Sequence, residues 1–177
     1  AAVACRKQYK GVLRPVNLEK EPEADGMTIQ EETFATFWQD GAPLFAEHCD
    51  VVGEPSDDYL FKNLDLVKKL DAIGALQIVT ARSNGRMFGY LVTVVGPSPE
   101  SPDHVTGTQT IFFASDDVPS IGMKLQKTSI ALLRGRGVGR VVFRAGVRGS
   151  GKRLGTLYRR LGAEPFGNLY TLSLGSA

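Results

Sequence analysis

Cysteine and histidine are scarce in this sequence of 177 residues, which contains two of each. The two cysteines, Cys5 and Cys49, are too few for a disulfide-stapled scaffold or for a zinc site built from several thiolates. A chain of this length with 42% hydrophobic residues can bury an adequate core without such cross-links. We therefore expect no metal, and a reducing compartment such as the cytoplasm.

Long apolar runs are also missing. The longest stretch without a charge, Met87 to Pro99, is interrupted by glycine and proline, whereas a membrane helix requires about 20 apolar residues. The first ten residues, AAVACRKQYK, hold no apolar stretch of signal-peptide length, and their basic residues follow the small ones. We expect neither a membrane-spanning segment nor secretion.

Acidic residues are nearly absent from the last third of the chain. Residues 1–120 hold ten Lys or Arg and eighteen Asp or Glu, whereas residues 121–177 hold eleven Lys or Arg and only Glu164. The resulting positive field suits the phosphates of a cofactor, nucleic acid or an acidic protein surface, although a solvated basic face is an alternative. Because the basic residues are not interleaved with aromatic ones that could stack on bases, nucleic acid is the less favoured partner.

Local signals in the first half predict a strand followed by helices. Residues 9–16 have strand character. Thr28, with Glu31 three positions later, resembles a capping box and predicts a helix from Thr28. Further helices are expected over residues 43–51 and 56–74. His48 and Cys49 lie beside Glu47 in the first of these, but neighbouring helical residues diverge in direction, so a nucleophile or metal pair is not favoured.

The second half begins with the strongest turn signal. Asn84 and Gly85 separate two β-rich runs and predict a tight hairpin, since both residues readily take positive φ angles. A proline-rich loop is expected to follow, ending near His104. The pattern then predicts a strand over 107–115, a helix from about 119, a strand over 138–145, a helix over 152–161 and a strand over 169–174. This order of elements predicts a three-layer α/β protein.

The order of elements, together with the segment LYRRLGAEP at Leu157–Pro165, resembles the GNAT family of N-acetyltransferases, and particularly the GNAT-like proteins encoded by tailed bacteriophages. The resemblance implies a mixed, largely antiparallel central sheet with helices on both faces. It also implies a tail over residues 1–8, a single domain over 9–177 and acetyl-CoA as cofactor. In that family the corresponding tyrosine protonates the departing thiolate, so the resemblance gives Tyr158 this role. The alternative is an aromatic residue that packs on an amphipathic helix.

The family holds the cofactor pyrophosphate with Arg or Gln, two residues, Gly, one residue, then Gly or Ala, at a helix N-terminus. Residues 134–139, RGRGVG, match this pattern, but they follow a helix and leave only 19 positions before Tyr158. We interpret them as a helix-ending turn with Gly137 at positive φ. The equivalent position after strand 107–115 leaves 36 positions from Gly122 to Tyr158. The implied cofactor-binding residues are Asp117, Val118, Ser120, Ile121, Gly122 and Met123.

This segment departs from the family pattern at three positions. Asp117 stands where a cation or amide is expected, Pro119 lacks an amide hydrogen, and Ser120 replaces a glycine. The sequence therefore predicts weak or absent acetyl-CoA binding. A transferase also needs a base, and strand 107–115 contains no carboxylate. His104 is the candidate base, with a loop or packing histidine as the alternative.

Two functions remain open at this point. The first is a structural component of a tailed-phage virion, in the head–tail, neck or tail assembly, with a degenerate acetyl-CoA site. Residues 1–10 and the basic third would then contact other virion proteins and copies of the same chain. The second is an active acetyl-CoA-dependent N-acetyltransferase that acts on an amine acceptor in the cytoplasm.

Overall fold

The computed structural model describes residues 26–52, 63–98, 101–145 and 151–167. The chain separates into two compact units, residues 1–144 and 145–177, and each is described by itself. The expected strands over 9–16 and 169–174, the tail over 1–8 and the start of the helix at Ser56 lie outside the described residues. The prediction of a single domain stays a prediction.

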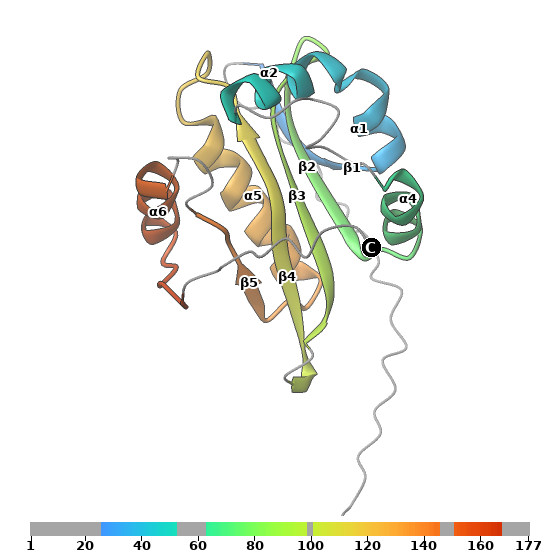
Figure 1. Cartoon of the computed structure of the whole chain (residues 1–177), viewed down its shortest axis with the longest axis vertical. Coiled ribbons are helices and arrows are strands. Elements are labelled where there is room, and N and C mark those ends of the chain that lie inside the picture. Colours follow the sequence, from blue (N-terminus) through green and yellow to red (C-terminus); the bar gives the residue numbers. More distant parts are fainter. Residues whose placement is uncertain (1–25, 53–62, 99–100, 146–150, 168–177) are drawn as a thin grey trace, which may run out of the picture. The chain divides into compact units, whose positions relative to one another are not determined.

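The first unit is built on a five-stranded sheet with the strand order β1-β2-β3-β4-β5 (Figure 1). Strands β1 to β4 are antiparallel to one another in sequence order, and β5 is parallel to β4. The strands are β1 (Met27–Glu32), β2 (Leu76–Ser83), β3 (Arg86–Ser98), β4 (Ser101–Ala114) and β5 (Arg140–Val142).

Strand β1 corrects the prediction of a helix from Thr28. Residues 27–32 pair with β2 along their whole length, from Met27↔Ser83 to Glu32↔Ile78. The helix α1 (Phe34–Asp40) begins later, and the side chain of Thr33 accepts a hydrogen bond from the amide of Thr36. Residues 27–32 form a strand despite the capping signal at Thr28, because β2 offers them a full ladder of backbone hydrogen bonds. Such tertiary pairing overrides a weak local helix propensity.

Helices cover both faces of the sheet, as predicted. One face carries α1, α2 (Ala42–Val52) and α4 (Leu64–Ala72), whose apolar residues join one core cluster with β2, β3 and β4. The opposite face carries α5 (Ile121–Gly135), which forms a second cluster with β1, β2 and β3. The largest fully buried side chains come from both layers and include Phe37, Ile78, Tyr90, Leu91, Leu125 and Leu133.

The hairpin between β2 and β3 forms at the predicted turn, where Asn84 has a φ of 49° and Gly85 a φ of 79°. The expected proline-rich loop after β3 is wrong. Strand β3 continues to Ser98, β4 starts at Ser101, and Pro97 pairs with Val105. Strand β2 reaches only as far as the pair Leu76↔Val94. No described strand pairs with that edge of β3 beyond it, so a residue without an amide hydrogen is tolerated there.

The last described elements are short. Strand β5 covers three residues of the predicted 138–145 and pairs with Thr106 to Thr108 of β4. In the second unit, α6 (Gly151–Arg160) occupies the predicted helix and ends at Gly162, which has a φ of 85°. Within the described ranges, no helix has the length and apolar character needed to cross a membrane.

Candidate functional site

Strand β4 separates from β5 part of the way along its length. The two strands pair only at Thr106, Gly107 and Thr108, while β4 continues to Ala114 (Figure 1). The pairing with β3 is irregular next to this point, where the register shifts between Val92 and Thr93. In the described part of the chain, the outer edge of β4 beyond Thr108 has no strand partner. Its backbone groups can therefore pair with a ligand.

The turn from β4 into α5 and the first turn of that helix contain the six implied cofactor-binding residues. Ser120 precedes the helix with a φ of 65°, and its side chain makes no capping hydrogen bond. Its carbonyl accepts from the amides of Met123 and Lys124. Among the described residues, no backbone hydrogen bond is made by the amides of Ser120 and Gly122. Open amides at the start of a 15-residue helix attract anions.

Packing fixes this turn against the sheet. A Cβ atom added to Gly122 would lie 3.1 Å from Cζ of Phe112 and 3.6 Å from Cβ of Ala114, so glycine lets α5 approach β4 closely. Ile121 is buried in the second core cluster, and Val118 packs against that cluster. The open amides therefore have a defined place relative to β4.

Arg86, at the start of β3, brings a positive charge to the turn. Its Nη2 atom lies 3.8 Å from Oδ2 of Asp117, with both side chains about two-thirds exposed. The guanidinium also lies 4.7 Å from the ring centroid of Phe88. Sequence reasoning missed Arg86, because only the β2–β3 turn places it beside a residue 31 positions later. The pair offsets the charge that Asp117 carries where the family pattern has a cation.

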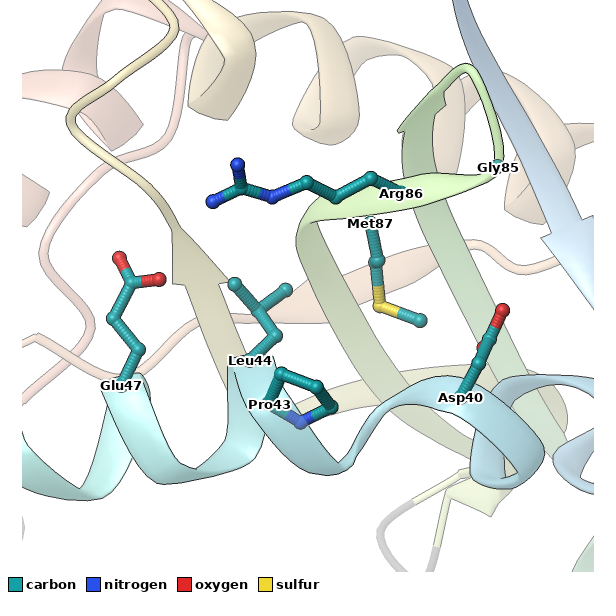
Figure 2. Close-up of a pocket in the computed structure, with 7 residues that line it drawn as sticks. All are labelled: Asp40, Pro43, Leu44, Glu47, Gly85, Arg86 and Met87. Carbon is teal, nitrogen blue, oxygen red and sulfur yellow. The ribbon is translucent and has the colours of Figure 1, made fainter.

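A pocket of about 310 Å³ lies next to this ion pair, between the α1–α2 junction and the tip of the β2–β3 hairpin. Its lining comprises Asp40, Pro43, Leu44, Glu47, Gly85, Arg86 and Met87. Figure 2 shows the apolar side chains between the carboxylates of Asp40 at one end and Glu47 at the other. Because Arg86 belongs to both features, the pocket adjoins the β4–α5 turn.

Arg82 fixes the carboxylate of Asp40. Its Nη1 and Nη2 atoms donate to the two oxygens of Asp40 at 2.7 and 2.8 Å, and Nε and Nη2 donate to Glu32 at 2.7 and 3.0 Å. Hydrogen bonds from Arg82 lower the pKa of Asp40 below its ordinary value. Burial alone would raise the pKa of Glu32, but the hydrogen bonds that it accepts, first of all from Arg82, give a net lowering. Both carboxylates therefore stay ionised around the guanidinium.

His48 of α2 is buried in the core between the helices α1 and α2 and the sheet. Its Nδ1 atom is 2.7 Å from the hydroxyl oxygen of Tyr90, and its ring stacks on Phe113 with centroids 4.7 Å apart. Burial lowers the pKa of His48 to about 4, so the imidazole is neutral at pH 7. Cys49, the next residue, is buried and unbridged. No group of three or more possible metal ligands exists among the residues that the structure describes.

The two predicted catalytic residues lie on different parts of the chain. Tyr158 is buried on α6 of the second unit, and burial raises its pKa to about 12. His104 is exposed near the start of β4. Ten residues separate it from Ala114, which is roughly 30 Å along a strand. The structure therefore does not bring His104 to the β4–α5 turn, and both assignments stay predictions.

The segment 134–139 is a helix end, as interpreted from the sequence. Gly137 has a φ of 78°, and its amide donates to the carbonyl of Arg134. The side chain of Arg136 points inward: it donates to the carbonyl of Gly74 and to Oε1 of Glu31, the latter at 3.1 Å. This segment connects α5 to β1 and to the loop before β2, so its role is to hold these elements together.

Comparison with known proteins defines the class of fold. No protein-family model and no curated protein matches the sequence. Solved structures of GNAT-fold acetyltransferases match this chain over nearly their whole length. The mixed sheet with helices on both faces is therefore a GNAT fold, as the resemblance implied.

Three solved structures illustrate the likeness. An aminoglycoside acetyltransferase, HMB0005, from an uncultured soil metagenomic sample matches with a TM-score of 0.69 at 12% identity, covering 84% of this chain and 99% of its own. Ribosomal-protein-alanine N-acetyltransferase from Brucella melitensis biovar Abortus 2308 gives 0.62 at 19% identity, with the same coverage. A predicted acetyltransferase with acetyl-CoA from Clostridium acetobutylicum gives 0.63 at 13% identity, covering 84% and 96%. At these identities the likeness shows the fold alone.

Proposed function

We propose that this chain is an acetyl-CoA-dependent N-acetyltransferase whose β4–α5 turn receives the diphosphate of the cofactor. The observation that carries the proposal is the backbone of the turn. Ser120 is held in the left-handed region, and the amides of Ser120 and Gly122 are open at the start of α5. A non-glycine residue in this region costs about 1 kcal/mol or more, and such strain tends to persist where a site needs it.

The residues of the turn fit an anion in part. The open amides and the helix dipole favour a diphosphate, whereas Pro119 offers no amide hydrogen. The sequence alone predicted weak or absent binding because Asp117 repels an anion, Pro119 lacks an amide hydrogen and Ser120 replaces a glycine. Arg86 changes that expectation, since its guanidinium lies close enough to offset the carboxylate. We expect acetyl-CoA to bind at roughly 10–100 μM, within the ordinary range of enzyme substrates.

The chain's own groups would divide the remaining work. Acetyl-CoA supplies an activated acetyl thioester. The open outer edge of β4 offers backbone hydrogen bonds to an extended ligand. Tyr158, with a pKa of about 12, keeps its proton at neutral pH and can donate it to a leaving thiolate. His104 stays the predicted base, although the structure places it near the end of β4 that is far from the β4–α5 turn.

Calorimetric titration of the full chain with acetyl-CoA tests the proposal. Ser120→Asp should abolish binding, because it places a second carboxylate at the open amides. Ala131→Asp is the matched control, since it adds the same charge at an exposed position further along α5 and should leave affinity unchanged. No heat of binding at 1 mM acetyl-CoA, on the order of the upper limit for enzyme substrates, would refute the proposal.

A structural role in a tailed-phage virion is the second candidate. Asp117 and Pro119 favour it, because they remove a charge and an amide from the position where the family pattern binds pyrophosphate. In this case the chain would contact other virion proteins and copies of itself through its basic third and residues 1–10. Absence of acetyl-CoA binding together with self-association of the purified chain would favour this candidate.

A further inference from the structure

We propose that the pocket between the α1–α2 junction and the β2–β3 hairpin binds an organic cation, the ammonium end of a short alkylamine, with Glu47 as its counter-charge. The pocket is bounded by α1, α2 and the hairpin tip, not by the outer edge of β4. The inference is therefore independent of the proposed function, because it requires neither acetyl-CoA nor acetyl transfer.

The middle of the pocket suits an alkyl stem. Pro43, Leu44 and Met87 provide apolar surface between its two ends (Figure 2). The volume of about 310 Å³ lies at the lower end of the range for small-molecule sites, which matches a ligand of only a few carbons. Methionine adapts to such a stem, since its side chain is unbranched and polarisable.

The two carboxylates that line the pocket differ in their partners. Asp40 is bound by two hydrogen bonds from Arg82. Arg86 is paired with Asp117. Glu47, half-buried on α2, has no hydrogen bond or ion pair among the described residues. Glu47 is therefore the lining carboxylate whose oxygens are open to pair directly with a bound ammonium group.

The donor set favours an organic cation over a metal ion. A divalent cation prefers six or more oxygen ligands, and the described residues contain no group of three or more acidic, histidine or cysteine side chains that could hold one. One open carboxylate above an apolar floor instead matches an ammonium group on a hydrocarbon chain, which can place its head at Glu47 and its stem along Met87.

The three methionines of the chain allow a direct test by NMR of methyl-¹³C-methionine in the full-length protein. Met87 reports on the pocket, Met123 on the start of α5, and Met27 on the opposite core cluster. Titration with n-butylammonium chloride should shift the Met87 signal saturably and leave the other two in place. Equal concentrations of n-butanol, which has the same stem without the charge, should shift it far less.

Glu47→Gln tests the counter-charge, and Asp50→Asn is its matched control. Asp50 is exposed on the same helix, and both substitutions remove one negative charge. Glu47→Gln should weaken n-butylammonium binding about fivefold or more, whereas Asp50→Asn should not. Equal affinity for n-butanol, an unshifted Met87 signal, or an equal loss of n-butylammonium affinity in both variants would overturn the inference.

Since the comparison with n-butanol uses the unmodified chain, it tests the inference even if Glu47→Gln fails to fold. Binding of acetyl-CoA is followed separately through the methyl signal of Met123 at the start of α5.

Discussion

His48 is a buried histidine that is neutral in the folded chain. The residue is 5% exposed, its ring contacts Tyr90 and Phe113, and its pKa is about 4 against an ordinary value of 6.5. The unfolded chain therefore takes up a proton at a higher pH than the folded chain does. As the pH falls from 6.5 to about 4, this difference favours unfolding, and below about 4 it adds nothing more.

We predict that His48 lowers the free energy of unfolding by up to about 3 kcal/mol between pH 6.5 and pH 4. Urea denaturation of the unmodified chain and of His48→Gln at both pH values measures this contribution. The variant, although less stable at neutral pH, should lose less stability on acidification, since the carboxylates titrate in both proteins alike. Parallel pH dependence in the two proteins would show that His48 does not carry the effect.

Tyr158 is the second residue whose environment decides its chemistry. With a pKa of about 12 it can donate a proton at neutral pH but cannot act as a base. We predict that Tyr158→Phe lowers kcat on the order of 10²-fold and leaves the Kd for acetyl-CoA nearly unchanged. Steady-state kinetics and calorimetry check the two quantities. An unchanged kcat in a folded variant would remove the role as acid.

At the scale of elements, the start of α5 combines strain with close packing. Ser120 is left-handed, and Gly122 lies against Phe112 and Ala114. We predict that Ser120→Gly raises the free energy of unfolding by up to about 1 kcal/mol, because glycine adopts this φ without a steric cost. Gly122→Ala should lower it by about 1 kcal/mol or more, since its Cβ would crowd the ring of Phe112.

Thermal or urea unfolding of both variants checks the signs. Gly137→Ala gives a reference for glycine at positive φ without crowding, because nothing lies within 4 Å of a Cβ added there. Stabilisation by Gly122→Ala would mean that α5 and β4 are not in close contact.

The C-terminal end of α5 is held against β1 by the side chain of Arg136. The side chain of Arg136 is 2% exposed and binds Glu31 and the carbonyl of Gly74. Burial raises the pKa of Glu31 despite the charge of Arg136. We predict that Arg136→Met costs about 3 kcal/mol, because it leaves Glu31 and Gly74 without this partner.

A double-mutant cycle separates the ion pair from the packing. Adding Glu31→Gln to Arg136→Met should recover part of the lost stability, as the buried charge is removed. Additive effects of the two substitutions in urea unfolding would show that the pair does not couple.

At the scale of the whole molecule, the charge is strongly segregated along the chain. Residues 1–120 carry a net charge of −8 and residues 121–177 one of +10, and together they give the formal +2. Oppositely charged parts of neighbouring copies attract one another, which favours head-to-tail association that closes into a ring when the rotation permits.

We predict salt-dependent self-association of the full chain, weakened by deletion of residues 1–10. Sedimentation velocity at about 50 mM and 500 mM salt measures it, because surface attraction is screened beyond roughly 10 Å at 0.1 M. Circular dichroism confirms that the truncated chain is folded. Monomers of both chains at low salt would remove the assembly proposal and leave the enzyme proposal alone.

Short-range chemistry determined much of this protein from the sequence by itself. The hairpin at Asn84 and Gly85, the helix ending before Gly137 and helix α6 follow from residues a few positions apart. The GNAT fold followed from the order of such elements and the motif near Tyr158. These features depend on turn geometry and apolar periodicity, which local sequence records directly.

Tertiary structure alone decided the features that depend on distant partners. Residues 27–32 are a strand because β2, 46 to 56 positions later, pairs with them, and Pro97 lies in a strand because β2 ends before it. Arg86 meets Asp117, and Glu47 and Met87 line one pocket, only after the sheet and helices have packed. Local propensities are worth tenths of a kcal/mol per residue, whereas pairing and burial are worth several per element, so the long-range terms prevailed.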